Sequence, residues 1–201
     1  MSLWNKSVHL TSHRLELVPL DLKHHDDLCL AVEDGQLWRL WFTSVPHPND
    51  VAAYIKKALN EYECQRSIPF AIIDSTSGKA IGSTRFCNLV PRHNRLEIGY
   101  TFYAKSYQRT AFNTQAKYLL LTYAFEQLDC IAVEFRTHWH NHKSRSAIAR
   151  LGAKQDGILR NHMKSPDGLL RDTVIFSIIE SEWPAIKAGL TFKLSDDASY
   201  Y

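Results

Sequence analysis

Several short runs of the chain alternate apolar and polar residues, which is the two-residue period of a strand with one buried face. The run RLEIGYTFY at 95–103 is the clearest example. Strict alternation would place Leu96, Ile98, Tyr100 and Phe102 on one face, and Glu97, Gly99, Thr101 and Tyr103 on the other. We predict seven strands in all, at 14–20, 69–74, 79–86, 95–103, 131–138, 152–160 and 172–179.

Helical periodicity separates many of these strands. Apolar residues recur at the spacing of a helix in 21–33, 49–64, 113–128 and 141–151, and a last helix opens near Glu182. Asp21 is a suitable N-cap for the first helix, and Gly152 a suitable C-cap for the fourth. The sequences STSG at 75–78 and SPDG at 165–168 predict hairpin turns.

The order of these elements predicts an α/β fold with a mixed sheet of about seven strands. Strand 95–103, helix 113–128 and strand 131–138 form a βαβ unit, whose strands should be parallel and whose crossover should be right-handed. Ligands of such units bind beyond the carboxyl end of the first strand, where the next helix begins.

A polar turn, KSYQRTAFNTQAK, occupies that position. The first N–H groups of a helix lack partners and carry a partial positive charge, so they suit a phosphate. Arg109 adds a full charge, and Gln108, Thr110 and Thr114 add neutral donors. Spacing alone leaves two interpretations open: an anion site, or a helix capped by Asn113 or Thr114. The turn has no glycine, which favours the second.

Composition narrows the possible classes of protein. The chain has 201 residues, of which 45% are hydrophobic and 22% charged, so we expect one domain spanning 1–201. A net charge of +3 without a basic stripe disfavours a nucleic-acid partner. No apolar run is long enough to span a membrane, and the start lacks a secretory signal. The four cysteines stand far apart, as expected of reduced thiols in a cytoplasmic protein. The tail SDDASYY is expected to be loose.

Other candidate chemistry is weaker. His138, His140 and His142 alternate, but the third falls in a helix and no Cys or Asp ligand lies nearby, so we expect no metal. No GxxxxGK[ST] sequence is present, which disfavours a kinase or NTPase. The aromatic residues Trp38, Trp41 and Phe42 form either a substrate pocket or a corner of the core.

Three runs of the sequence together resemble the Gcn5-related N-acetyltransferases (GNAT), and within them the RimJ/RimL branch, which acetylates protein N-termini and related amines. The runs are RLEIGYTFYAKSYQRTAFNTQAK, NHKSRSAIARLGA and GILRNHMKSPDGLLRDTVIFSIIESEW, and the resemblance covers about 10–190. It implies the GNAT fold, a twisted mixed sheet with helices on both faces. The parallel strands 95–103 and 131–138 would then splay apart to admit the pantetheine arm of acetyl-CoA.

The resemblance also implies a pyrophosphate loop. The family sequence is Gln/Arg-x-x-Gly-x-Gly/Ala, and here Gln108 holds its first position while Ala111 and Asn113 replace the two glycines. Alanine is small, and asparagine tolerates left-handed backbone angles. The residues expected to bind the pyrophosphate are Gln108, Arg109, Thr110, Ala111, Phe112, Asn113 and Thr114.

Further roles follow from the same resemblance. Gly99 would mark a bulge, and the backbone groups of Phe102 and Tyr103 would pair with pantetheine, with N–H groups near Tyr103 as the oxyanion hole. Asn141 would bond the pantetheine amide, cap its helix, or do both. Ser144 would protonate the departing thiolate, or else be a serine at the edge of the core.

A general base is needed because an amine arrives as ammonium. Glu97 is the first candidate, since its neighbours would partly desolvate it and raise its pKa. Glu134 on the parallel strand is the alternate, and a chain of water molecules is a third possibility. Trp38 and Trp41 would line the acceptor groove, which the N-terminal region covers in the family.

The sequence therefore predicts direct transfer of acetyl from acetyl-CoA to a primary amine, without a covalent enzyme intermediate. The acceptor is either a protein N-terminus or a small amine, and a homodimer is possible because relatives often pair. The alternative function is a non-catalytic acyl-CoA-binding regulatory module.

Overall fold

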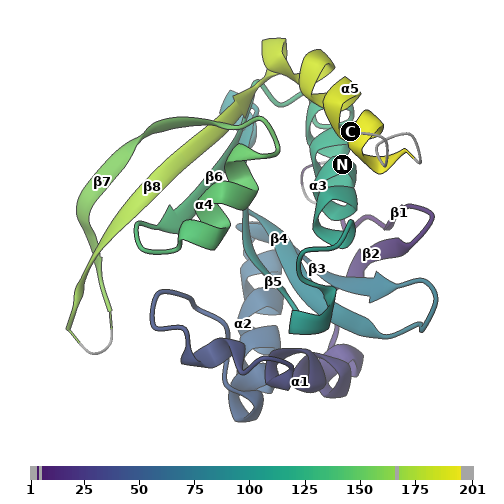
Figure 1. Ribbon diagram of the computed structural model, residues 1–201, viewed down its shortest axis with the longest axis vertical. Helices are drawn as coiled ribbons and strands as arrows, with labels where there is room; N and C mark the ends of the chain where they lie inside the picture. The colour runs from purple at the N-terminus through teal and green to yellow at the C-terminus, as the bar shows by residue number, and fades with distance from the viewer. Residues whose placement is uncertain (1–3, 5, 166–167, 196–201) are drawn as a thin grey trace.

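The chain is organised around one mixed β-sheet (Figure 1). The computed structural model describes residue 4, residues 6–165 and residues 168–195. Within them eight strands run in the order β1-β2-β3-β4-β5-β6-β8-β7. The strands are β1 (Leu10–Thr11), β2 (Leu15–Pro19), β3 (Ser67–Asp74), β4 (Ala80–Val90), β5 (Arg95–Tyr103), β6 (Ala132–His138), β7 (Lys154–Lys164) and β8 (Leu170–Ile179). All seven predicted strands are present, and the two-residue β1 is too short for periodicity to detect.

Helices cover both faces of the sheet, as predicted (Figure 1). The helices α3 (Phe112–Glu126), α4 (His142–Ala149) and α5 (Trp183–Leu194) share one hydrophobic cluster with the strands, which includes Leu120 and Val133. On the other face, α1 (His25–Glu33) and α2 (Val51–Glu63) form a second cluster, which includes Leu28 and Ile55. A mixed α/β fold with two covered faces is thereby confirmed.

The second face is covered unevenly. Helix α2 packs mainly on β3 and α1 on β4. The β7–β8 hairpin instead stands away from both helices (Figure 1). The half of the sheet formed by β5, β6 and β8 therefore has a more open face on this side.

The predicted helices differ from the observed ones mainly at their ends. A 3₁₀ turn at Leu22–His24 precedes α1, and the Asp21 carboxylate accepts a hydrogen bond from Lys23 N at 2.9 Å. The predicted cap is therefore correct, although it caps the 3₁₀ turn and α1 itself begins at His25. In the predicted turn at 165–168, Gly168 N donates to Ser165 O at 2.8 Å. The middle of that turn, residues 166–167, and the tail at 196–201 lie outside the described residues.

Strands β5 and β6 are parallel, as predicted, but only briefly. Their register joins 95–97 of β5 to 132–134 of β6 and stops there. Strand β5 continues for six more residues beside β4 alone. The two parallel strands therefore separate toward their carboxyl ends, at the side where α3 begins.

A bulge in β5 accompanies this separation. Gly99 pairs with Arg85 and Phe102 with Ser83, so β5 carries one extra residue opposite β4. Tyr100 accommodates the extra residue by adopting a left-handed backbone conformation, with a φ of 52°. The predicted strict alternation is wrong beyond Ile98, because Tyr103 joins the cluster under α3 while Phe102 joins the cluster under α1 and α2.

A buried lysine lies against the bulge. Lys117 of α3 is 5% exposed, and its Nζ donates to Thr101 Oγ1 at 2.7 Å and to Thr84 Oγ1 at 3.3 Å. The two threonine hydroxyls are 2.8 Å apart across β5 and β4. Burial lowers the pKa of Lys117 to about 7. Lys117 is not among the residues singled out from the sequence, although its spacing from Leu121 and Ala124 is that of the buried helix face.

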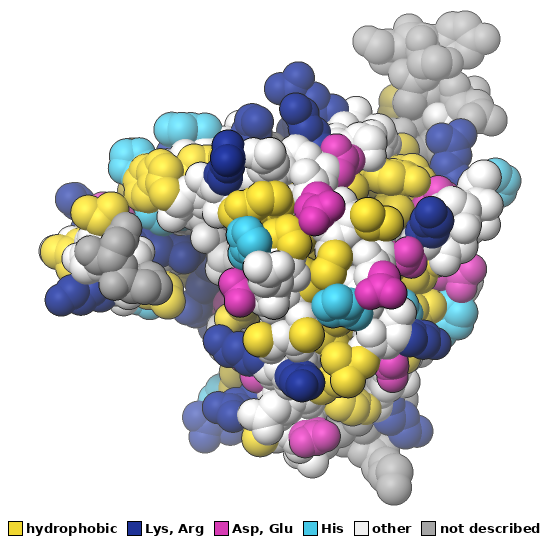
Figure 2. Space-filling model, turned by 90° about the horizontal axis from the view of Figure 1, so that it is seen from below, with side chains coloured by type: hydrophobic (Ala, Val, Ile, Leu, Met, Phe, Trp, Pro, Cys, Tyr) yellow, Lys and Arg dark blue, Asp and Glu magenta, His cyan; other side chains and the backbone are white. Residues whose placement is uncertain are grey.

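No helix among the described residues is both long and apolar enough to cross a membrane. The face seen from below in Figure 2 intersperses basic and acidic side chains, in keeping with the small net charge of +3.

Gly82→Ala is expected to destabilise the fold at the bulge. A Cβ on Gly82 would overlap the carbonyl oxygen of Phe102, a backbone atom that cannot rotate away. We expect the free energy of unfolding in urea to fall by about 1–3 kcal/mol, the usual cost of overpacking.

Gly189→Ala is the matched control, because Gly189 lies in α5 and a Cβ there meets open space. Its free energy of unfolding should stay the same or rise by up to ~1 kcal/mol, since alanine favours helix. Equal stability of Gly82→Ala and wild type would contradict the close approach of β4 and β5.

Lys117→Met is expected to change how stability depends on pH. The unfolded lysine has its ordinary pKa near 10.5 and the folded one about 7, so between these values the unfolded chain binds the extra proton. This contribution makes stability rise with pH above about 7, by at most ~1.4 kcal/mol per pH unit. Urea unfolding at pH 7, 8 and 9 should show a flatter dependence for Lys117→Met than for wild type.

Lys57→Met, at an exposed position on α2, is the control and should follow the wild-type dependence on pH. Parallel curves for wild type and Lys117→Met would mean that Lys117 keeps an ordinary pKa in the folded protein.

Candidate active site

The turn between β5 and α3 is held in place from two sides. The N–H groups of Lys105 and Ser106 donate to the backbone oxygen and to the Oδ2 of Asp34, at 3.1 and 2.8 Å. The hydrogen bond from Ser106 lowers the pKa of Asp34. On the other side, Tyr107 OH donates to Asp74 Oδ2 at 3.0 Å. These anchors fix where α3 begins.

The N-terminus of α3 and the turn before it contain several backbone N–H groups without hydrogen-bond acceptors. Within the described residues, the N–H groups of Arg109, Thr110, Ala111, Asn113 and Thr114 have no acceptor. Helical bonding begins only when Gln115 N donates to Ala111 O at 2.9 Å. The geometry is that of a helix N-terminus able to bind an anion.

Several side chains predicted to bind pyrophosphate instead contact other parts of the turn and of β5. Gln108 Nε2 donates to the carbonyl oxygen of Tyr103 at 3.1 Å, so its side chain secures the end of β5. Thr110 Oγ1 donates to Tyr107 O at 2.6 Å and lies 3.4 Å from Phe112 N. The Phe112 ring packs edge-on against Tyr107, with 5.0 Å between centroids.

The left-handed residue of the turn is Arg109, with φ of 61°, and its side chain is exposed. We expected Asn113 to need this conformation in place of a glycine, but Asn113 lies inside α3, which begins at Phe112. The turn therefore makes its sharp bend two residues before the first expected glycine position, Ala111.

The start of α4 brings Asn141 and Ser144 together. Asn141 is the N-cap, and its Oδ1 accepts a hydrogen bond from Ser144 N at 3.0 Å. Ser144 is half-buried on the side of the helix that leads to buried Ile148. The capping role of Asn141 is thus present, and its predicted contact with pantetheine stays a prediction.

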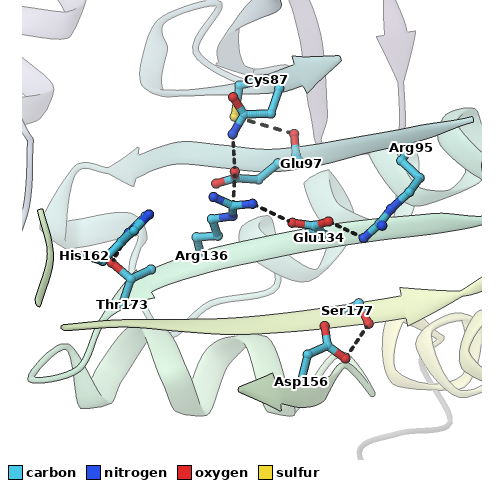
Figure 3. A network of polar contacts seen from close by, with 10 residues as sticks. Cys87, Arg95, Glu97, Glu134, Arg136, Asp156, His162, Thr173 and Ser177 are labelled. Carbon is cyan, nitrogen blue, oxygen red and sulfur yellow. Dashed lines mark hydrogen bonds and ion pairs between the residues drawn. The ribbon is translucent and has the colours of Figure 1, made fainter. Parts of the chain in front are cut away.

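Glu97 lies in a polar network on the open face of β5 (Figure 3). It is 8% exposed, Asn88 Nδ2 donates to its Oε2 at 2.7 Å, and Arg136 Nε lies 3.5 Å from the same oxygen. Burial raises the pKa of Glu97, while the hydrogen bond from Asn88 and the charge of Arg136 partly oppose this. The predicted direction of the pKa shift is confirmed. A Cβ on Gly99 would come within 3.2 Å of Glu97 Oε1, so the glycine leaves room for the carboxylate.

Glu134, the alternate base, forms ion pairs with two arginines (Figure 3). It pairs with Arg95, and its Oε2 accepts from Arg136 Nη2 at 3.0 Å. Arg136, which bridges the two glutamates, is not among the residues singled out from the sequence. Its place two residues after Glu134 on the same strand face could have indicated it.

The two tryptophans expected in the acceptor groove are in different surroundings. Trp38 is partly buried against the cluster under α1 and α2 and contacts His47. Trp41 is 59% exposed, and its ring lies 5.0 Å from that of His138 at the end of β6. A cavity of about 310 Å³ lies beside Trp41, His138 and Asp172. Of the two predicted tryptophans, Trp41 lines this cavity and Trp38 does not.

Within the described residues, no three His, Cys, Asp or Glu side chains come together as a metal site would require. His138 and His140 do lie close, with ring centroids 5.5 Å apart, but His142 begins α4.

Comparison with known proteins assigns the family. Residues 14–154 match the family described as acetyltransferase (GNAT) domain. The chain is 26% identical over 178 residues to "Uncharacterized N-acetyltransferase p20" of Bacillus licheniformis, covering 87% of this chain and 97% of that protein. It is 25% identical over 185 residues to "Putative ribosomal N-acetyltransferase YdaF" of Bacillus subtilis strain 168, covering 89% and 96%.

Solved structures agree with this assignment. A GCN5-related N-acetyltransferase from Brucella melitensis superposes with a TM-score of 0.85 at 29% identity, covering 96% of this chain and 87% of that one. Mycobacterium smegmatis RimJ, solved with CoA-disulfide, shares the fold with a TM-score of 0.77 at 18% identity, covering 92% and 94%. The predicted RimJ/RimL-like branch agrees with these likenesses. The chain therefore belongs to the GNAT acetyltransferases, and it is an N-acetyltransferase.

Proposed function

We propose that the protein transfers acetyl directly from acetyl-CoA to a primary amine, in the gap where β5 and β6 separate. The observation that carries this proposal is the row of unused N–H groups at 109–111 and 113–114, placed at the open end of that gap. A diphosphate would satisfy several of these donors and the partial charge of α3 together. Arg109 would add a full positive charge from the exposed side of the turn.

The chain offers further groups for the rest of acetyl-CoA. Among the described residues, the separated part of β5 has no partner strand on the β6 side, so its backbone near Phe102 and Tyr103 can pair with an extended pantetheine arm. The Tyr103 carbonyl is already used by Gln108, which leaves the N–H groups of this region as the proposed oxyanion donors. Asn141, at the start of α4, would bond the arm while it caps the helix.

Two side chains are proposed to transfer protons during the reaction. The acceptor must lose a proton before its nitrogen attacks the thioester carbonyl, and Glu97 would take that proton directly or through a water molecule. Its buried position and raised pKa suit a base that works near neutral pH. When the carbon–sulfur bond breaks, Ser144 would donate a proton to the thiolate. The new amide nitrogen loses its second proton in the same stage, and this proton would replace the one that Ser144 gave up.

The acceptor is proposed to enter from the face on which Glu97 lies, near Trp41 and the His138 ring at the end of β6. The name of the relative YdaF favours a ribosomal protein as acceptor, and the cavity beside Trp41 would equally take part of a small amine. We propose that the reaction takes place in the cytoplasm, and a homodimer is one assembly in which the protein could carry it out.

Glu97→Gln is expected to lower kcat/KM by about 100-fold or more, the range typical of general-base catalysis. Thiol release from acetyl-CoA with a panel of primary amines measures the rate. In wild type the rate should fall as the pH is lowered through the Glu97 pKa, which burial places above 4.5. The pH–rate profile of Glu97→Gln should lack this decrease at low pH.

Ser144→Ala should lower kcat with little change in KM.

Lys57→Met is the control and should keep wild-type kinetics, since it is exposed on α2. Tight binding of CoA without turnover of any amine would overturn the proposal in favour of a non-catalytic acyl-CoA-binding module.

Arg109→Gly tests the diphosphate site without straining the turn, because glycine accepts the left-handed φ of this position. Loss of one charge-assisted contact, worth about 1.5 kcal/mol, should raise KM for acetyl-CoA by about 10-fold. The rate with acetyl-pantetheine, which has no diphosphate, should not change. Arg92→Gly, at an exposed turn, should leave both substrates unaffected, and an equal effect of Arg109→Gly on both would contradict the assignment.

A further inference from the structure

Arginine side chains gather around the open face of β5, β6 and β8, and nearly all of them have acidic partners. Arg136 pairs with Glu97 and Glu134, and Arg95 pairs with Glu134. On neighbouring β4, buried Arg85 pairs with Glu61 at 2.8 Å. The guanidinium groups that hold the strands together are therefore already neutralised.

Arg171 of β8 is the exception. Among the described residues it forms no ion pair and no side-chain hydrogen bond. Its Nε is buried without an acceptor, as are those of Arg85 and Arg136, but those two arginines have carboxylate partners at another guanidinium nitrogen. The side chain is only partly exposed. A guanidinium removed from water without an acceptor is destabilising, so a buried Nε of this kind needs an explanation.

The register of the sheet places Arg171 on the same open face as Glu97. Along β8, Val174, Phe176 and Ile178 belong to the cluster under α3, so Arg171 and Thr173 alternate to the opposite side. Thr173 pairs directly with His138 of β6. Arg171 therefore extends the face that carries Glu97 and Arg136 toward the end of β6.

Electrostatic effects agree with this placement. Burial is the main cause that lowers the pKa of Arg171, and the charges of Glu97 and Tyr100 act in the opposite direction. Burial also lowers the pKa of His138, and the positive charge of Arg171 is the second largest cause of that decrease. Arg171 is thus within electrostatic range of the proposed base, of the bulge and of the histidine beside Trp41.

The nearby carboxylates are already bonded to other groups. Glu97 accepts from Asn88, and Glu134 from two arginines. Asp172 accepts from Arg160 at 2.5 Å and from Asn161 N at 2.8 Å. An anion for Arg171 would therefore come from outside the described chain.

We infer that Arg171 binds an anionic oxygen group, a carboxylate or a phosphate, that the acceptor carries in addition to its amine. This inference rests on the proposed function, because it specifies the substrate class of the same site. The acceptor nitrogen would lie near Glu97 while its anionic group lies against the guanidinium, which can bind two oxygens at once. Amines of this class include amino acids, aminoalkyl phosphates and peptides with an acidic side chain near the amino terminus.

The test uses pairs of amines that share a skeleton and differ only in the anion. Suitable pairs are β-alanine with β-alaninamide, phosphoethanolamine with ethanolamine, and seryl-glutamate amide with seryl-glutamine amide. Thiol release at low ionic strength gives KM and kcat for each. For wild type, the anionic member of at least one pair should have a KM about 10-fold or more below that of the neutral member. Which pair shows this separates a carboxylate from a phosphate, and a small acceptor from a peptide.

Arg171→Gln should remove that preference by raising KM for the anionic member relative to the neutral one, since any effect of the lost charge on Glu97 acts on both members alike. Arg171→Lys should restore part of the preference, because it keeps the charge without the planar fork. Arg92→Gln, an exposed arginine in the turn before β5, should keep the wild-type preference. Urea unfolding of each variant checks that the fold is kept.

Competition provides a readout on the wild-type protein that does not depend on any variant folding. At saturating acetyl-CoA, acetate or inorganic phosphate should raise KM for the preferred anionic amine of wild type, and should raise it less for Arg171→Gln. Equal KM values within every pair, together with no competition, would overturn this inference and leave the proposed function intact. Absence of turnover with every amine would instead overturn the proposed function, and this inference with it.

Discussion

The extra residue that β5 carries at the bulge is the constraint on which the proposed site depends. Without it, β5 would continue in register between β4 and β6, and its last residues would have partners on both sides. With it, Tyr100 adopts a left-handed φ of 52°, and β5 stays with β4 while its pairing with β6 ends after Glu97. The same shift exchanges the faces of Phe102 and Tyr103. One irregular residue thus opens the sheet at the position where α3 begins.

Polar groups from both faces support this irregular segment. On one face, Lys117 joins α3 to Thr101 of β5 and Thr84 of β4. On the other, the ring of Tyr100 lies 4.1 Å from the guanidinium carbon of Arg85, which pairs with Glu61 of α2. Gly99 keeps space for the Glu97 carboxylate between them. Burying these charges is unfavourable in itself, but each is paired or hydrogen-bonded, so removing one partner would leave another unsatisfied.

Much of the fold could be predicted from the sequence, because alternation and helical periodicity are local signals. They located seven strands, five helices and the parallel pair at the centre. The bulge and the conformations it sets could not be predicted, since Tyr100 and Arg109 take left-handed angles that tertiary contacts impose on residues with no preference for them. Spacing likewise could not separate Trp38 from Trp41, which only the folded loop sends to different surroundings. The direction of the pKa shift of Glu97 could be predicted, because its neighbours on the strand bury it. Its partners Asn88 and Arg136 could not, since they come from the end of β4 and from β6 and only the sheet register brings them together.

Amide hydrogen exchange of the protein with and without CoA tests most directly whether the start of α3 binds the diphosphate. The structure predicts that CoA slows exchange in two kinds of peptide. The first contains residues 109–111 and 113–114, whose N–H groups have no acceptor among the described residues. The second contains the end of β5, which pairs with β4 and not with β6. Peptides from exposed parts of α2 should exchange at the same rate in both states. Binding of CoA that leaves the exchange of residues 109–114 unchanged would contradict the central claim.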